Sequence, residues 1–299
     1  MIRNVLKFNF IAIILLYTLT GFTQKTNTQN SIDAFVNQEI LKSASIGLEI
    51  RDLKTGALLA ERLSEKSLTP ASTQKLITTA AALELLGSDF RFETEINYDG
   101  ELTKLGILNG NLIIKGMGDP SLGSKYFKDE EVCKQLAQVI RALGVKSIKG
   151  KLIVDTDLFK AEIPRTWIWE DIGNYYGAVP HPMSYKDNTY TLHFTSQNAG
   201  QITTVKTIDN KQTDLEFSNE VLASTVNRDR AYIFGGNTSN KRRIEGTIPQ
   251  NRSDFKVKGA VSKPASVFAQ DLENVLSRLG VKFEKKELPS KTSELLFLH

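Results

Sequence analysis

Apolar residues recur at helical spacing in four stretches of the chain. These stretches are residues 31–44, 69–87, 129–144 and 262–280. The first begins at Ser31, a favoured helix cap, and carries Phe35 and Ile40 on its apolar stripe. The last two end at Gly144 and Gly280, which are typical C-terminal caps. The pattern therefore predicts four helices.

The apolar faces of the two later helices can be assigned residue by residue. In the helix over 129–144 the predicted face consists of Val132, Leu136, Val139, Ile140 and Leu143. In the helix over 262–280 it consists of Phe268, Leu272, Val275, Leu276 and Leu279. Each set predicts one buried stripe.

Alternating apolar and polar residues predict strands elsewhere. Residues 45–63 alternate, turn at Lys54-Thr55-Gly56 and alternate again, which predicts a two-stranded hairpin. Residues 91–258 contain many short β-like runs separated by Gly, Asn and Asp. Two of these runs share a Gly-x-Leu-Ile pattern, at Gly110 and at Gly150, and indicate two similar strand units.

These elements predict a domain order. Residues 91–258 form a β-rich insertion, expected to fold as two subdomains, between two α/β pieces at 24–90 and 259–299. Neither flanking piece is large enough to close a domain alone. We therefore expect the two pieces to pack together as one incomplete α/β domain.

The first residues have the composition of an export signal. A basic start is followed by an apolar run of about fifteen residues, short for a membrane span. We interpret residues 1–23 as a signal peptide cut before Gln24, with a membrane anchor as the alternative. The protein is then exported to the periplasm or cell envelope. Its one cysteine, Cys133, allows no intramolecular disulfide and is expected to be a buried helix residue.

The charge of the chain argues against a nucleic-acid partner. The net charge is +4 over 299 residues, and the basic residues are dispersed among acidic ones. A nucleic-acid-binding surface requires clustered basic residues. The three histidines, His181, His193 and His299, lie far apart without the paired spacing of a metal site. No metal or cofactor is expected.

One pair of residues suggests catalysis. Ser72 and Lys75 are three positions apart at the start of the helix over 69–87, so they lie on one helical face. A serine hydroxyl is a weak nucleophile until a base removes its proton. The positive end of the helix dipole, together with burial, favours the neutral amine that a base requires. The helix start also supplies backbone N–H groups that can stabilise an oxyanion.

The spacing alone does not establish this role. Ser72 in the first turn also suits a structural cap, with Lys75 solvated. A second Ser-x-x-Lys match, Ser253 and Lys256, lies in a β-like segment. On a strand, positions three apart point to opposite faces, which argues against a second catalytic pair.

The context of the pair resembles a known family. "PASTQKLITTAAALELLG" after "DLKTGALLAERLSEKSLT" is similar to the S13 peptidases, low-molecular-mass penicillin-binding proteins of the D-alanyl-D-alanine carboxypeptidase/endopeptidase type. The resemblance extends to the long insertion after the helix, to "GMGDPSL" and to "WIWEDIGNYYGA". It implies a β-lactamase/transpeptidase-like α/β fold interrupted by the β-rich insertion.

The family carries two further motifs, S-x-N and K-T-G, that complete its site. The literal matches here are Ser196-Gln197-Asn198, inside the insertion, and Lys54-Thr55-Gly56, in the hairpin turn before the nucleophile. In the family both motifs follow the region where this chain ends, so we reject both matches. We expect a truncated sequence, with the remaining motifs beyond His299.

The resemblance also implies the chemistry. Ser72 would form an acyl-enzyme with peptidoglycan stem peptides, Lys75 would serve as its base, and β-lactams would inhibit by trapping the serine. Asp171 matches an acidic position of the family's inserted domain and would contact a cationic group of the substrate. The alternatives are a Ser-x-x-Lys β-lactamase or esterase, a non-catalytic peptidoglycan-binding envelope protein, and an inactive fragment.

Overall fold

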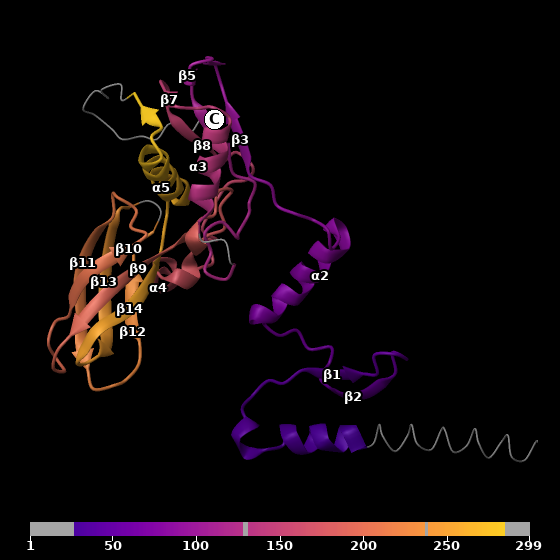
Figure 1. The fold of residues 1–299 in the computed structure, drawn as a ribbon. Helices are drawn as coiled ribbons and strands as arrows, with labels where there is room; N and C mark the ends of the chain where they lie inside the picture. The colour runs from indigo at the N-terminus through magenta and orange to yellow at the C-terminus, as the bar shows by residue number, and fades with distance from the viewer. Residues whose placement is uncertain (1–26, 128–130, 237–238, 285–299) are drawn as a thin grey trace, which may run out of the picture. The chain divides into compact units, whose positions relative to one another are not determined.

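The computed structural model describes residues 27–127, 131–236 and 239–284, and these residues form two compact units that meet in sequence at Phe90 and Arg91 (Figure 1). Among these residues no helix has the length and apolarity needed to cross a membrane. The predicted signal peptide at 1–23 lies outside the described residues.

The first unit contains short helices and one hairpin. Residues 27–36 are helical. The other elements are the 3-10 helix η1 (Glu39–Leu41), strands β1 (Leu48–Arg51) and β2 (Leu58–Arg62), the 3-10 helix η2 (Ala71–Thr73) and helix α2 (Gln74–Leu86).

The N-terminal helix differs from its prediction at both ends. It already includes Asn27, whose carbonyl accepts a bond from the Ser31 hydroxyl at 3.0 Å, so Ser31 is an interior residue and not the cap. The helix stops after Val36, and η1 follows as a separate turn. Ile40 on η1 is 88% exposed, so the predicted apolar stripe is not buried as a whole.

The predicted hairpin is confirmed, since β1 pairs with β2 in antiparallel register. Its turn depends on Asp52, whose Oδ1 accepts bonds from the backbone N–H groups of Lys54 and Thr55 and from the Thr55 hydroxyl. These bonds, the Thr55 hydroxyl first, lower the pKa of Asp52. Gly56 takes a left-handed φ of 71°, as such a turn requires. Lys54-Thr55-Gly56 therefore has a structural role.

Over its described residues, the second unit holds four small sheets and three helices. Its helices are α3 (Val132–Ala142), α4 (Trp169–Ile172) and α5 (Pro264–Arg278), and its 3-10 turns are η3 (Tyr175–Gly177) and η4 (Lys186–Asn188). Two sheets have the strand orders β15-β7-β5-β4 and β3-β6-β8. The other two have the orders β10-β9-β14 and β11-β13-β12.

The strands of the first two sheets are β3 (Glu95–Tyr98), β4 (Glu101–Leu102), β5 (Ile107–Asn109), β6 (Leu112–Lys115), β7 (Ser147–Ile148), β8 (Leu152–Asp155) and β15 (Lys282–Phe283). Those of the other two are β9 (Thr189–Ser196), β10 (Thr204–Asp209), β11 (Glu216–Ser224), β12 (Arg230–Phe234), β13 (Lys241–Pro249) and β14 (Arg252–Ala260).

The Gly-x-Leu-Ile repeat forms paired strands. Its two copies align as β6 and β8, a parallel pair in which Leu112 lies opposite Leu152, and the preceding strands β5 and β7 also pair in parallel. The two glycines lie where the copies touch. A Cβ on Gly150 would lie 2.3 Å from the carbonyl oxygen of Gly110, so only glycine fits there.

Helices α3 and α5 pack against each other, and α5 also packs on β8. On α3 the buried residues are Val132, Cys133, Ala137 and Ile140. The prediction of a buried Cys133 is confirmed, whereas Val139 and Leu143, expected on the same face, are exposed. The stripe is rotated because Cys133 and Ala137, one helical turn apart, lie at the contact with the rest of the unit.

Helix α5 is part of the core of the second unit. Its buried residues, among them Phe268, Leu272 and Leu276, belong to one hydrophobic core together with residues of all four sheets. Residues 259–284 thus belong to the same compact unit as residues 91–258, and α5 contacts α3 and β8 there. The association of residues 259–299 with residues 24–90 stays a prediction.

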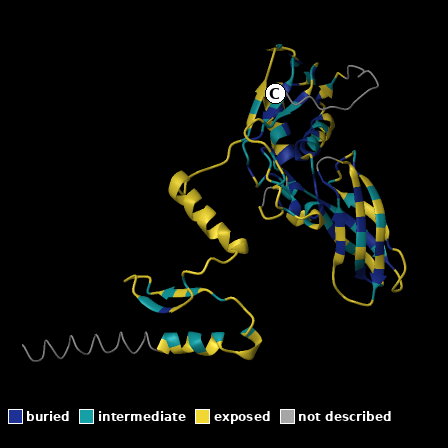
Figure 2. Cartoon of the chain, turned by 180° about the vertical axis from the view of Figure 1, so that it is seen from behind, coloured by how far each residue is buried: buried dark blue, intermediate teal, exposed yellow. Residues whose placement is uncertain are grey.

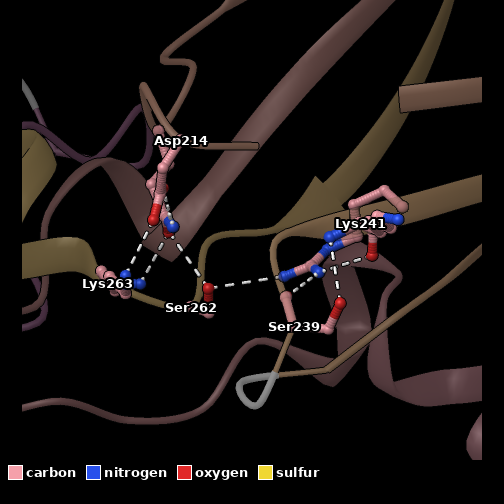
Figure 3. A network of polar contacts seen from close by, with 7 residues as sticks. Asp214, Ser239, Lys241, Ser262 and Lys263 are labelled. Atoms are coloured by element: carbon pink, nitrogen blue, oxygen red, sulfur yellow. Dashed lines mark hydrogen bonds and ion pairs between the residues drawn. The ribbon is translucent and has the colours of Figure 1, made fainter. Parts of the chain in front are cut away.

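A buried arginine ties the sheet of β13 to the segment before α5 (Figure 3). Arg242 is 2% exposed, and its Nη1 donates to the carbonyls of Ser239 at 2.6 Å and Lys241 at 3.0 Å. In the segment before α5, the hydroxyl of Ser262 donates a hydrogen bond to Oε1 of Gln212. The same Oε1 also accepts the backbone N–H of Lys263. Burial lowers the pKa of Arg242.

Candidate functional site

The predicted nucleophile lies at a tight entry into α2. Ala71 has a left-handed φ of 45°, which is strained for a residue with a side chain, and Ser72 follows it in η2. The hydroxyl of Thr73 donates to the carbonyl of Pro70 within this turn. Ser72 makes no capping bond, so the reading of Ser72 as a structural cap is not supported. Backbone strain of this kind is concentrated at functional sites.

The structure brings the predicted pair together. Lys75 lies in the first turn of α2, and its Nζ is 3.2 Å from the Oγ of Ser72, with the amine as donor. In a catalytic cycle a neutral lysine would accept the serine proton across the same contact, since this separation is close to the hydrogen-bond reach that a general base requires.

The surroundings of the pair differ from the expectation. Ser72 and Lys75 are both exposed, and α2 has no buried residue, as Figure 2 shows by its colour. Apolar side chains of α2 such as Leu76 and Leu85 are 71% and 82% exposed. Residues 27–90 therefore do not supply the burial that we expected to favour a neutral Lys75, and the contribution of the helix start to an oxyanion site stays a prediction.

The rejected motif matches have structural explanations. Ser253 and Lys256 lie on β14, a strand, as predicted. Ser196 lies on β9, where its buried hydroxyl donates to the carbonyl of Pro249 at 2.6 Å and accepts the backbone N–H of Arg252. This side chain joins β9 to the turn before β14 and is not presented to solvent.

Asp171 lies in α4, in the second unit, and is half-buried. Its neighbour Tyr176 has its pKa raised to about 12, first by burial and then by the negative charge of Asp171. Asn174, which no sequence pattern indicated, holds this segment on β12. The side chain of Asn174 donates to the Glu170 carbonyl at 2.6 Å and accepts the Ile233 N–H at 3.0 Å. The role of Asp171 in substrate binding stays a prediction.

Within the described part of the chain, no group of His, Cys, Asp and Glu is arranged to hold a metal ion. His181 is half-buried, and its Nδ1 accepts the backbone N–H of Met183. His193 lies between two aspartates on neighbouring strands. His299 lies outside the described residues.

Together these features indicate the class of proteins that carry a Ser-x-x-Lys motif at the start of a helix. The features are the hairpin, the strained turn, the Ser72–Lys75 pair and the β-rich region after them. Comparison with known proteins then identifies the family. The model of the D-Ala-D-Ala carboxypeptidase 3 (S13) family matches residues 28–294, and the chain belongs to this family.

The curated relatives carry matching names. The chain is 26% identical over 267 residues to the D-alanyl-D-alanine carboxypeptidase DacB of Haemophilus influenzae, which covers 87% of this chain and 53% of the relative. It is 26% identical over 264 residues to the D-alanyl-D-alanine carboxypeptidase of Actinomadura sp. (strain R39), covering 86% and 48%. The chain thus spans about half the length of these relatives.

Solved structures show the same fold. The crystal structure of penicillin binding protein 4 (dacB) from Haemophilus influenzae matches with a TM-score of 0.62 at 24% identity, over 83% of this chain and 55% of that one. Its complex with a β-lactam matches with a TM-score of 0.60. The mixed helix and sheet fold of this chain therefore matches about half of that structure.

Proposed function

We propose that the protein is a serine-type D-Ala-D-Ala carboxypeptidase or cross-link endopeptidase that acts on peptidoglycan stem peptides. The observation that carries this proposal is the 3.2 Å contact between Ser72 Oγ and Lys75 Nζ in a chain that matches the S13 family over residues 28–294. The relatives named D-alanyl-D-alanine carboxypeptidase support the same substrate class.

The reaction proceeds in two halves. Neutral Lys75 takes the proton of the Ser72 hydroxyl as the oxygen attacks the carbonyl carbon of the penultimate D-Ala. The tetrahedral intermediate collapses, the C–N bond breaks, and the departing amine of the terminal residue receives a proton. Water then attacks the ester and loses a proton to neutral Lys75, the C–O bond to Ser72 breaks, the shortened peptide leaves as a carboxylic acid, and Lys75 passes the proton to the serine oxygen.

In this proposal Asp171 binds the cationic group of the stem peptide. The support is its half-buried carboxylate next to Tyr176 on a segment held rigidly by Asn174. A contact of this kind improves binding more than the chemical step, since it does not touch the reacting atoms. β-Lactams, which one relative of known structure holds in its crystal, would acylate Ser72.

We infer export from the same reasoning. The substrate lies in the cell envelope, and the basic and apolar residues of 1–23 have the composition of a signal peptide. The periplasm or cell envelope is then the compartment in which the protein acts.

Labelled penicillin tests the nucleophile. The chain is incubated with the label and analysed under denaturing conditions for covalent uptake. Ser72→Ala should abolish the uptake, and Lys75→Ala should slow it by roughly 10²–10⁴-fold because the general base is lost. Ser253→Ala, in the second Ser-x-x-Lys match, is the matched control and should label like the wild type. Covalent uptake of label by Ser72→Ala would contradict the assignment of Ser72 as the nucleophile.

A second function is favoured by the exposure of the site. Ser72 and Lys75 are exposed on a helix without buried residues, and the chain spans about half of its relatives. A chain of this kind could bind peptidoglycan without cleaving it. The label distinguishes the two functions: a folded wild-type chain that takes up no label but sediments with purified peptidoglycan supports the binding function, whereas Ser72-dependent uptake excludes it.

A further inference from the structure

His193 holds an unusual position on the outer face of the sheet β10-β9-β14. It lies on β9, the middle strand, and each of its ring nitrogens contacts a carboxylate from a different flanking strand. Nε2 is 2.8 Å from Asp209 on β10, and Nδ1 is 2.7 Å from Asp254 on β14. One side chain thus connects all three strands.

We propose that His193 is a pH-sensitive clamp: as an imidazolium it ties both flanking strands to β9, and on losing its proton it releases one of them. A carboxylate can only accept a hydrogen bond, so both ring nitrogens must carry a proton for both contacts to exist. A neutral imidazole has one N–H and one lone pair, and the lone pair would then face a carboxylate.

The charged groups around His193 favour the imidazolium. Two carboxylates contact the ring of His193, those of Asp209 and Asp254. One positively charged residue, Lys256, lies directly opposite His193 in the register with β14. On β10 the residue opposite His193 is the neutral Thr207. Lys206 lies next to Thr207, where the register of β10 shifts, and Lys258 lies two residues beyond Lys256 on β14. The pKa of His193 is raised, first by its bond to Asp209 and then by its bond to Asp254.

The arrangement does not suit a metal ion. The two aspartates occupy opposite nitrogens of one ring, so a single ion cannot contact both carboxylates and the imidazole at bonding distance. Proton binding is the chemistry that this geometry supports.

Strand β10 is the one that the clamp releases. Strand β14 has other attachments at its far end, where Gly259 bridges to Asn174 and the Ala260 N–H donates to the Gly173 carbonyl at 3.0 Å. Strand β10 pairs only with β9 among the described strands, and Asp209 is its last residue. Loss of the Asp209 contact therefore leaves this strand end held by the ladder to β9 and by the packing of Ile208 against the core.

The test follows His193 and β10 together in the full chain by NMR. The ring signal of His193, assigned by its disappearance in His193→Gln, should titrate above the usual value of about 6.5. Hydrogen-exchange protection of the β10 amides should fall roughly two- to fivefold as pH rises through that titration, the size expected when an exposed ion pair is lost. The β14 amides at Gly259 and Ala260 should change less.

Two variants sharpen the test. Asp209→Asn and Asp254→Asn should each lower the titration point of His193, and Asp209→Asn should remove the pH dependence at β10. His181 gives an internal control because it has no carboxylate contact. The proposal is overturned if His193 titrates at or below about 6.5, or if β10 protection does not follow its protonation; the wild-type titration decides this even if a variant fails to fold.

Discussion

At the residue scale, adjacent positions on one strand can have opposite roles. Arg242 and Arg243 follow each other on β13, so their side chains point to opposite faces. Arg242 is buried and bound to backbone carbonyls, whereas Arg243 is exposed and pairs with Glu220 and Glu245. Composition cannot separate the two, because they differ only in which face of the sheet they occupy.

This contrast gives a stability prediction. Arg242→Ala should lower the free energy of unfolding by about 3 kcal/mol, because two backbone carbonyls lose their donor and the buried side chain leaves a cavity. Arg243→Ala, which removes exposed ion pairs and a cation–π contact with Phe234, should cost about 1 kcal/mol. Urea unfolding followed by tryptophan fluorescence measures both. Similar losses in the two variants would contradict the structural role assigned to Arg242.

At the element scale, period and terminal signals identified the helices, and packing selected the face that each one buries. Helix α5 ends next to Gly280 as expected, and its predicted residues Phe268, Leu272 and Leu276 are fully buried. On α3, by contrast, Cys133 and Ala137 replace Val139 and Leu143 at the contact. Small residues such as Cys133 and Ala137 allow another element to approach the helix closely. A hydrophobicity pattern gives such residues less weight than large apolar ones and so does not predict this contact.

Helix α5 can be tested directly. Leu272→Ala should lower the free energy of unfolding by roughly 2–5 kcal/mol, since the side chain is fully buried between packed elements. Gln270→Ala on the exposed side of the same helix is the control and should change it by less than about 0.5 kcal/mol. Thermal unfolding followed by circular dichroism compares the two. A small effect of Leu272→Ala would mean that α5 does not belong to this core.

At the scale of the whole molecule, the two described histidines give opposite responses to pH. Burial lowers the pKa of His181, whereas the flanking aspartates raise the pKa of His193. Because the pKa of His181 is lowered in the folded protein, the unfolded chain binds the proton first as pH falls. The contribution of neutral His181 to folding stability is therefore complete above about pH 6.5 and is lost as pH falls below that value. A raised pKa gives the reverse: stabilisation is complete below about pH 6.5 and is lost as pH rises through the folded value.

The free energy of unfolding of the second unit should therefore pass through a maximum as pH varies. His181 should cause part of the decline on the acid side of that maximum. His181→Gln should reduce the loss of stability between about pH 7.5 and pH 5.5 while it keeps an acceptor for the Met183 N–H. Both tryptophans, Trp167 and Trp169, lie in this unit, so their fluorescence in urea titrations reports on it. An unchanged acid decline in His181→Gln would exclude this role.

Much of the site was predictable, because its signal is local. Ser72 and Lys75 are three residues apart, and a helix brings such residues together whatever surrounds it. Asn174 and the Asp209–His193–Asp254 contact were not predictable. Their partners lie on other strands, up to 61 residues away in the case of Asp254, and only strand register brings them together.

The sequence by itself determined most of the elements, the Ser72–Lys75 pair and the family. These follow from spacing over a few residues, as in the hairpin turn at Asp52, the helix that carries Ser72, and the Gly-x-Leu-Ile copies. The tertiary structure alone decided which unit α5 joins, which face of α3 is buried, and that His193 meets two carboxylates. Those outcomes depend on contacts between residues distant in the chain, whose free energy is set by packing and register and leaves no local pattern.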